Sequence, residues 1–421
     1  MKPAHSPGST SRLQLLLLDL LSPCRRVQQA DLDALDPDGW QQLEAMVQQH
    51  RLGPLLAWQL AHAHAGVALP ADVSARLAQA RRQAAFRSLL FQQELIGIHR
   101  VLAAAGIPYQ ALKGAFLAFH AYPSAGLRPM RDLDILVPKA KVAAAYEVLQ
   151  AAGLRLISEH PVAPQVASGA HCHLAPLAAR CEQFTVELHT RLFHFRAYDR
   201  HARVDPSDDP VFWQRGRQAA LGGESVCFEA PEDLLLHLIV HAVYDHEFNN
   251  GPLLLSDVAF LLQRHPPDWN IFWARAEASG RARGCHLVMH LVRHYWGPQL
   301  VDMTGSTPPS QQEMDAFATL MLCDPADILD RHLCADAVQQ RSVLQWIRYL
   351  LDKAFASPAR VRLAYDLPIG DWRVVFYYPV RWYRQLTRQL PMLWRARGHE
   401  PPQSADLRQL DALRHWLESS R

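Results

Sequence analysis

The sequence predicts an α+β protein, in which a small mixed sheet is flanked by helical N- and C-terminal domains. Apolar residues return every three or four positions from Leu13 to about residue 105, which is the period of an amphipathic helix. From residue 106 to about residue 190, strand patterns alternate with helix patterns. The helical period returns after Glu229. These three observations place the sheet in the middle of the chain.

Length and composition indicate a folded protein with more than one core. A chain of 421 residues exceeds the size of about 250–300 residues at which a single core stops growing, so two or three domains are expected. Hydrophobic residues make up 49% and charged residues 20%, which excludes intrinsic disorder. The net charge of +2 does not favour a nucleic-acid partner, which would require a local basic face.

Two features indicate the cytoplasm. The apolar run from Leu13 to Leu21 is interrupted by Gln14 and Asp19, and it is shorter than the roughly 20 residues that cross a bilayer. No cleavage pattern of small residues follows it, as a secretory signal would require. The seven cysteines are scattered and include no CxxC pair, which is typical of reduced thiols. We therefore expect a cytoplasmic protein.

The central part of the chain begins with a turn, followed by two strands that alternate with two helices. A turn at Gly106–Tyr109 introduces an apolar run that ends at Leu112-Lys113-Gly114. A short helix is expected over Ala115–Tyr122, and after a loop rich in Pro, Ser and Gly the segment Arg131–Val137 alternates like a strand. The next helix, Ala140–Ala152, is expected to end before a glycine in the C′ position.

Further strands are expected at Leu154–Ser158, around His171–Leu174 and at Phe184–His189. A helix should begin at Ala230-Pro231-Glu232-Asp233, where a proline near the start is followed by acidic residues. The chain is therefore expected to have four parts: a helical N-terminal region (1–105), a mixed-sheet core (106–229), a helical region (230–300) and a helical C-terminal region (301–421).

Acidic residues on two expected strands predict a metal site. Asp132 and Asp134 are two positions apart, so their carboxylates leave the same face of the strand, about 6–7 Å apart. Two such carboxylates repel each other unless a cation lies between them. Magnesium is the natural occupant, because it binds carboxylates together with phosphate oxygens. Glu187, also flanked by apolar residues in a strand, could reach the same ions.

Basic residues upstream predict a phosphate site. Lys113 and Gly114 lie where a strand turns into a helix, a place that attracts phosphate, and a glycine there lets the phosphate approach the backbone closely. Arg128 precedes the acidic strand, and its planar guanidinium group could hold a phosphate.

This arrangement resembles the DNA polymerase beta-like nucleotidyltransferase superfamily, in which a turn with glycine is followed by Asp-x-Asp on one strand and a third acid on a later strand. It is most similar to an uncharacterised bacterial nucleotidyltransferase family, whose Leu-Lys-Gly, Arg and Asp-x-Asp elements match Leu112-Lys113-Gly114, Arg128 and the segment Asp132–Val137. Later elements of that family match His173, Glu187-Leu188-His189, and the group His241, His246 and Asp257. The resemblance covers residues 85–265 firmly and the last third loosely.

The resemblance implies an enzyme that moves a nucleoside monophosphate from a nucleoside triphosphate, expected to be ATP, to an unidentified small-molecule, peptide or protein acceptor, with release of pyrophosphate. The reaction would depend on two Mg²⁺ ions, with Mn²⁺ as a substitute, held by Asp132, Asp134 and Glu187 as catalytic residues. Lys113, Gly114 and Arg128 would bind phosphates, with His173 lining the nucleotide site. The region 230–300 would bind substrate or nucleotide through His241 and His246. One position departs from the superfamily pattern of Gly-Ser, because Ala115 follows Gly114 and offers no hydroxyl.

Two other groups of histidines fit a metal site less well. His171 and His173 alternate on one face, but no thiolate or carboxylate has the spacing that a zinc site requires. His237 and His241 are one helical turn apart and precede Asp245-His246. This pattern is similar to the metal-binding helix of a hydrolase, but the motif His-Glu-x-x-His is absent. We favour a helix that packs against the nucleotide cleft.

The C-terminal segment from Trp372 to Arg397 interleaves aromatic residues with arginines. Such a face could bind RNA or an anionic membrane, but the favoured interpretation is a helix that packs its aromatic residues and exposes its arginines. Two alternative functions remain open: a toxin-like enzyme that modifies tRNA or protein, and an inactive domain of the same fold that only binds a nucleotide or a partner.

Overall fold

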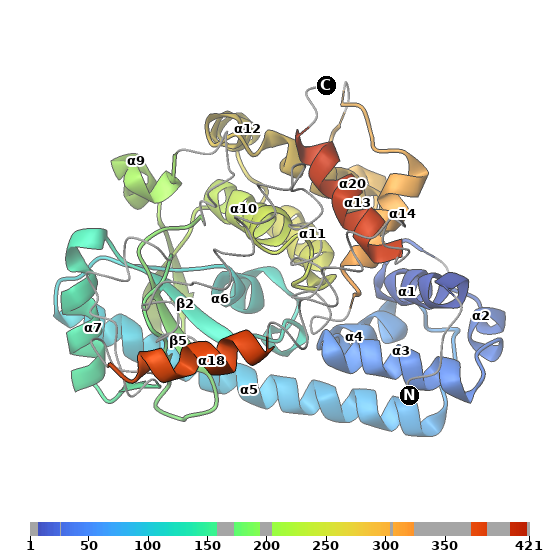
Figure 1. Ribbon diagram of the computed structural model, residues 1–421, viewed down its shortest axis with the longest axis horizontal. Helices are drawn as coiled ribbons and strands as arrows, with labels where there is room; N and C mark the ends of the chain where they lie inside the picture. Colours follow the sequence, from blue (N-terminus) through green and yellow to red (C-terminus); the bar gives the residue numbers. More distant parts are fainter. Residues whose placement is uncertain are drawn as a thin grey trace. The chain divides into compact units, whose positions relative to one another are not determined.

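The computed structural model of the protein describes residues 7–25, 27–157, 172–193, 204–303, 306–323, 372–384 and 405–418 (Figure 1). The chain divides into two compact units, one formed by residues 1–155 and 164–322 and the other by residues 156–163 and 323–421. The first unit contains the candidate site. Among the described residues of the second unit are the helices α18 (Val374–Arg384) and α20 (Ala405–Glu418). The four-part division expected from the sequence remains a prediction.

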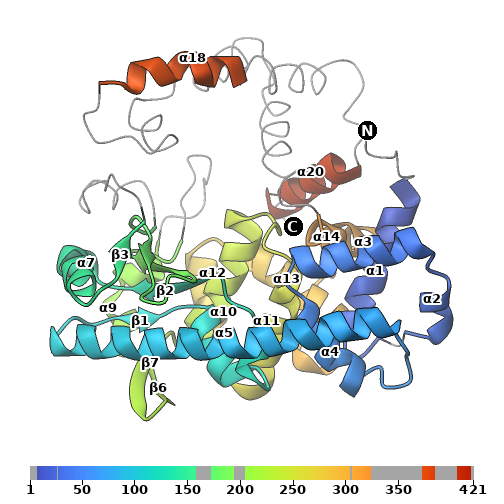
Figure 2. The ribbon, with the colours of Figure 1, turned by 90° about the horizontal axis from the view of Figure 1, so that it is seen from below.

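The first unit opens with helices, as predicted. Asp36 caps one of them by accepting a hydrogen bond from the backbone of Gly39, and Pro37 occupies its first turn. The long helix α5 contacts α4 and, toward its end, the strand β7 and the helix α7 (Figure 2). The bounds are α1 Pro7–Leu21, α2 Gln29–Asp33, α3 Pro37–Gln49, α4 Gly53–His62 and α5 Ala71–Ala104.

The described strands form one sheet in the order β3-β4-β5-β2-β1-β7-β6. The pairs β2 with β5 and β1 with β7 are parallel, whereas β1 with β2, β4 with β5 and β6 with β7 are antiparallel. The sheet is therefore mixed, and the predicted α+β class is confirmed. The strands are β1 Gln110–Ala111, β2 Asp132–Leu136, β3 Arg155–Leu156, β4 Leu177–Ala178, β5 Thr185–His189, β6 Arg217–Leu221 and β7 Glu224–Phe228.

Helices and turns connect these strands. The expected helix over Ala115–Tyr122 is present as the short α6 (Gly114–Phe116) followed by a π-helical turn, Leu117–Ala121. The expected helix Ala140–Ala152 is α7 (Val142–Ala151), and Gly153 follows its C-cap with a φ of 99°. The remaining connections are the 3₁₀ turns Ala125–Leu127, Lys139–Lys141 and Pro206–Asp208, and the helix α9 (Pro210–Gln214).

Helices follow β7, as the returning helical period predicts. Helix α10 begins at Pro231, which confirms the predicted start, and it ends in a second π-helical turn, His241–Asp245. Helices α10 and α11 both pack against α13. The bounds are α10 Pro231–Val240, α11 Leu253–Arg264, α12 Trp269–Ala278, α13 Ala282–Trp296, the 3₁₀ turn Pro298–Leu300 and α14 Gln311–Leu320.

One pair of strands was not predicted. The β6–β7 hairpin turns at Gly222 and Gly223, whose φ angles are 56° and 87°. Both angles are positive, as a tight two-residue hairpin turn requires, and glycine adopts them without strain. The Gly-Gly pair was the signal in the sequence. A Cβ atom on Gly222 would meet the Ile96 side chain of α5 at 2.5 Å, so the missing side chain also lets the turn contact that helix.

Some predicted features lie outside the described residues, among them Ser158, His171 and the arginines 388, 395 and 397. Of the aromatic residues expected to pack in the C-terminal helix, Trp372, Phe376 and Tyr383 are exposed. In the part of the chain that the structure describes, no helix combines the length and the apolar character that crossing a membrane demands.

Candidate active site

The candidate site lies on the two central parallel strands, β2 and β5. On β2, Leu133 and Ile135 point into the core and are only 1% and 0% exposed. Asp132 and Asp134 alternate with them on the other face, where both remain partly accessible. The alternation predicted from the sequence therefore places both carboxylates on the same side of the sheet.

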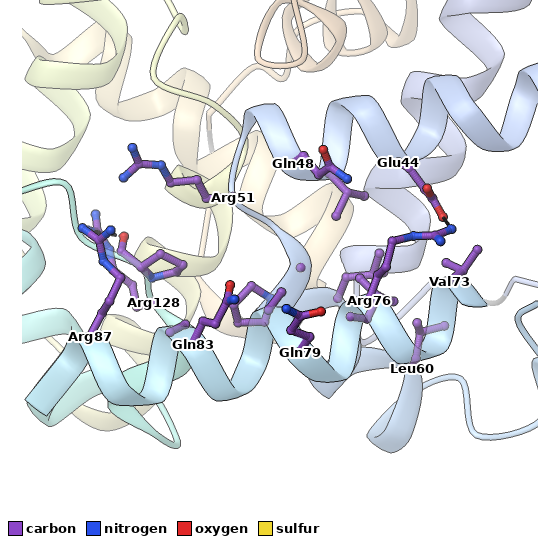
Figure 3. A pocket seen from close by; sticks show the side chains of 18 of the residues that line it. Glu44, Gln48, Arg51, Leu60, Val73, Arg76, Gln79, Gln83, Arg87 and Arg128 are labelled. Atoms are coloured by element: carbon purple, nitrogen blue, oxygen red, sulfur yellow. Dashed lines mark hydrogen bonds and ion pairs between the residues drawn. The ribbon is translucent and has the colours of Figure 1, made fainter. Parts of the chain in front are cut away.

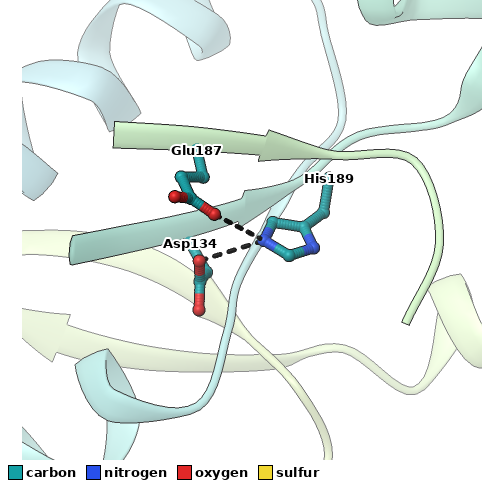
Figure 4. A group of neighbouring side chains, drawn as sticks. All are labelled: Asp134, Glu187 and His189. Atoms are coloured by element: carbon teal, nitrogen blue, oxygen red, sulfur yellow. Dashed lines mark hydrogen bonds and ion pairs between the residues drawn. The ribbon is translucent and has the colours of Figure 1, made fainter. Parts of the chain in front are cut away.

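The parallel register of β2 and β5 places Glu187 beside Asp132 and Asp134. Asp134 lies directly opposite Glu187 in the parallel ladder. Two residues further along β5, His189 points to the same side, because side chains alternate along a strand. One ligand atom from each of Asp134, Glu187 and His189 lies within 4.8 Å of the other two, so this group could hold a metal ion (Figure 4). Glu187 is therefore a neighbour of the acidic pair.

His189 belongs to the matched element Glu187-Leu188-His189, but no role at the site was predicted for it. Its Nε2 lies 3.0 Å from Oδ1 of Asp134 and 3.8 Å from Oε2 of Glu187. Burial lowers the pKa of His189, against the opposing effect of Asp134, so the imidazole is neutral. Because a carboxylate only accepts, Nε2 carries the proton and donates it to Asp134. The signal was the Glu-x-His spacing, which puts both side chains on one face of a strand.

Lys113 completes the site from the end of β1. Its Nζ lies 3.2 Å from Oδ2 of Asp134. Its backbone has a φ of 42°, which a lysine rarely adopts, and the backbone N–H donates to Oε2 of Glu229 at 2.9 Å. Glu229 is fully buried and also lies 2.7 Å from Nδ1 of the fully buried His237. Buried hydrogen bonds thus hold Lys113 in a strained conformation that aims its ammonium group at the acidic pair.

The charges at the site are unevenly compensated. Burial opposes ionisation of Asp134, but Lys113 and His189 outweigh it and hold its pKa well below the ordinary value. For Asp132, burial and the neighbouring charge of Asp134 raise the pKa. Burial also raises the pKa of Glu187, with Asp134 adding to the effect, although His173 opposes it. Three carboxylates therefore face one ammonium group, and negative charge is left over.

These residues fit a divalent cation. The donors are mainly carboxylate oxygens, which Mg²⁺ prefers, and the excess negative charge at Asp132 and Glu187 would be neutralised by such an ion. The imidazole of His189 already donates to Asp134 through Nε2. It therefore fits the role of a group that orients a ligating carboxylate better than that of a ligand.

The histidines predicted to line the site lie at different distances from it. Nδ1 of His173 is 3.7 Å from Oε2 of Glu187. His241 lies within electrostatic reach of Lys113 and Asp134, and burial together with Lys113 lowers its pKa well below the ordinary value. His246 contacts His241, with their Nε2 atoms 3.2 Å apart. The π-helical turn that begins at His241 brings this pair to the site.

The guanidinium group of Arg128 has a carboxylate partner, and its role in phosphate binding stays a prediction. Its Nε and Nη2 donate to the two carboxylate oxygens of Asp257, at 3.2 and 2.9 Å. Burial would lower the pKa of Arg128, but the charge of Asp257 outweighs burial and raises it. A Cβ atom on Gly114 would lie 2.6 Å from Nη1 of Arg128, so the glycine makes room for this guanidinium group. Arg128 therefore joins the loop before β2 to helix α11.

We expect Arg128→Ala to destabilise the protein by about 3–5 kcal/mol, because it leaves the carboxylate of Asp257 buried without its cation. The midpoint of urea denaturation measures the loss. The double variant with Asp257→Ala should lose less than the two single variants together, since neither charge is then left alone. If the midpoint of Arg128→Ala were unchanged and nucleotide binding were weaker, the ion pair would contribute little to stability. That result would support the phosphate-binding role predicted from the sequence.

The fold and the site together define a class: an α+β domain whose central parallel strands present carboxylates that could hold a metal ion. The chain belongs to a family of uncharacterised nucleotidyltransferases, whose model matches residues 36–297, more than half of the chain. No curated protein and no solved structure matches it. The family match includes α3, α4 and α5, and thus begins well before residue 85, where the resemblance was expected to start.

Proposed function

We propose that the protein transfers a nucleoside monophosphate from a nucleoside triphosphate, ATP first among them, to an acceptor and releases pyrophosphate. One observation carries the proposal: the parallel register of β2 and β5, which sets Asp134 opposite Glu187 beside Lys113. Family membership supports the same reaction class. This arrangement of two carboxylates and one ammonium group is consistent with nucleotidyl transfer because that reaction needs positioning and charge stabilisation more than covalent chemistry.

Asp132, Asp134 and Glu187 are the residues that we propose as holders of Mg²⁺, or Mn²⁺ in its place. Bound there, the ions would orient the α-phosphate and stabilise charge on the attacking and leaving oxygens. His189 fixes the orientation of Asp134 through its hydrogen bond. His241, which lies within electrostatic reach of Lys113 and contacts His246, would contact the nucleotide or the acceptor.

Lys113 has a second role in this proposal. Its ammonium group pairs with Asp134 and compensates the negative charge of the site. When a nucleotide enters, its phosphates offer new anionic partners, and the flexible side chain of Lys113 can turn to them from Asp134. The backbone at Lys113 stays fixed because Glu229 accepts from its N–H. Gly114 follows Lys113 in the chain, but the guanidinium group of Arg128 occupies the space that a side chain at Gly114 would take.

A metal titration and a transfer assay test the proposal together. Mg²⁺ should raise the unfolding temperature, because binding to the folded state alone adds about 2.7 kcal/mol at a hundredfold excess over Kd. Incubation with each labelled nucleoside triphosphate, Mg²⁺ and a cell lysate should label one class of molecule, and EDTA should abolish labelling. KCl at equal ionic strength is the control for the stability change.

The same assay separates the alternatives. Nucleotide binding without any labelled product, with Mg²⁺ or Mn²⁺, would identify an inactive binding domain and contradict the transferase. Label that enters tRNA or a protein would instead favour the toxin-like modifier. In the tRNA case, binding should weaken steeply with salt, because phosphate contacts release counterions.

A further inference from the structure

A second feature of the first unit has no role in the site described so far. Helices α1, α3, α4 and α5 enclose a cavity of about 530 Å³, and the segment Arg128–Met130 closes one end of it (Figure 3). Met130 is only two residues before Asp132, so the cavity borders the carboxylate strand. Its helices α3 to α5 lie within the family match. The cavity is therefore part of the nucleotidyltransferase region and adjoins the candidate site.

Arginine side chains gather at the end near the site. Figure 3 shows Arg51, Arg87 and Arg128 at the same end of the cavity. The guanidinium group of Arg51 is within electrostatic reach of Arg87, of Arg131 and of Asp132. Among the described residues, Arg51, Arg87 and Arg131 form no ion pair, in contrast to Arg128, which Asp257 neutralises. Like charges this close repel each other, so this end of the cavity favours an anion.

The backbone at Arg51 points to the same conclusion. Arg51 lies between α3 and α4 with a φ of 55°, a left-handed conformation that costs a non-glycine residue free energy. This conformation places the arginine on the cavity wall. At the opposite end Arg76 is paired with both Glu44 and Asp72, so its charge is neutralised. The positive charge of the cavity is thus concentrated at the end nearest Asp132.

The wall between these ends is mostly aliphatic. It includes Leu43, Val47, Leu56, Val73 and Leu77, with few aromatic side chains. A nucleobase is best held by stacking on aromatic rings, whereas an aliphatic chain gains about 0.8 kcal/mol for each CH₂ group that it buries. The lining therefore suits an aliphatic body better than a base, and the volume is in the range of small-molecule sites.

We propose that this cavity binds the acceptor, and that the acceptor has an aliphatic body and an anionic head group, a carboxylate or a phosphate, held by Arg51 and Arg87 at the end of the cavity nearest Asp132. The role as acceptor rests on the proposed transferase activity. In the reaction, an anionic oxygen of the head group forms a bond to the α-phosphorus. The bond from that phosphorus to the bridging oxygen breaks, and its electron pair leaves with pyrophosphate. No proton is removed, because the attacking oxygen is already ionised.

Calorimetric titration of the full chain with four ten-carbon probes tests the site without nucleotide. Decanoate and decyl phosphate should bind, and the stronger of the two identifies the head group. Decanol should bind at least about tenfold more weakly, because it cannot form charge-assisted hydrogen bonds, and decylamine should not bind. Equal binding of decanol, decylamine and the anions, or no binding of either anion, would overturn the proposal.

Variants locate the binding. The double variant Arg51→Gln with Arg87→Gln should weaken decanoate binding by about tenfold or more and leave decanol unchanged. Arg82→Gln, on the same helix α5 but outside this cavity, is the matched control. Ala84→Phe adds an aromatic ring to the cavity wall and should abolish binding, whereas Ala75→Phe, exposed on α5, should not. Circular dichroism melting of each variant confirms folding. Decanoate binding that survives both the double variant and Ala84→Phe would contradict the site.

The failure of this inference can be told from the failure of the proposed function. Decanoate binding without nucleotidyl transfer would keep the site and refute the transferase. Transfer to another acceptor without binding of either anion would keep the transferase and refute the site. Loss of ATP binding in Ala84→Phe, with no anion binding in the unmodified protein, would assign the cavity to the nucleotide and overturn the inference.

Discussion

Asp134→Asn is expected to reduce nucleotidyl transfer by more than about 100-fold, since removal of an outer partner of a metal ligand already costs about 10–100-fold. It should also destabilise the protein without metal by about 3 kcal/mol, because the ammonium group of Lys113 is left without its nearest carboxylate. Activity assays and urea denaturation in EDTA measure the two effects. Full activity would remove Asp134 from the site.

Asp132→Asn is the matched control for the stability change. It should lose activity to a similar extent, but its stability without metal should stay level or rise. The reason is that the folded structure raises the pKa of Asp132 through burial and the charge of Asp134, so the ionised form is unfavourable there. Equal destabilisation by both variants would contradict the assignment of Lys113 to Asp134.

Glu187→Gln is expected to reduce transfer by about 100-fold or more, with part of the activity recovered at high Mg²⁺. The substitution keeps the size of the side chain and removes one of the negative charges that attract the ion. Stability without metal should rise slightly, because burial and Asp134 disfavour the charged form of Glu187. A Mg²⁺ titration of both the rate and the unfolding temperature measures these effects.

Glu147→Gln on helix α7 is the control for Glu187→Gln, since Glu147 is exposed and lies on a helix outside the carboxylate cluster. It should change neither the rate nor the response to Mg²⁺. If Glu187→Gln behaved in the same way, the site would need a different third acid, and His189 with Asp134 would be the remaining pair at this position.

The sequence predicted those parts of the site that depend on strand alternation. The spacing of Asp132 and Asp134 between buried Leu133 and Ile135 is a local property, and the structure reproduces it. The neighbourhood of Glu187 depends on which strands pair and in which register, and only the resemblance to a family supported it. The position of His189 beside Asp134 depends on the same register. No local sequence pattern around His189 predicts that contact.

The carboxylate partners of the basic residues could not be predicted from the sequence, and their phosphate-binding roles stay predictions. Lys113 and Arg128 both fit a phosphate site by residue type, but a side chain binds the nearest strong partner that the fold supplies. For Arg128 that partner is Asp257 on α11, and for the Lys113 ammonium group it is Asp134. Asp257 is 129 residues from Arg128 in the chain, and Asp134 lies on β2, whereas Lys113 follows β1. The ion pairs of both cations therefore depend on contacts between separate elements. Secondary-structure propensity and residue spacing do not predict such contacts.

The parallel pairing of β2 with β5 has a consequence for how the protein folds. Asp134 and His189 are 55 residues apart in the chain, and Lys113 and Glu229 are 116 residues apart. Loop-closure entropy must be overcome before such contacts form, so chains rich in them fold slowly. No partly synthesised chain that ends before β5 can hold the carboxylate cluster. The carboxylate cluster therefore forms only after β5 has paired with β2, and any ion bound there would report that this part of the unit has folded.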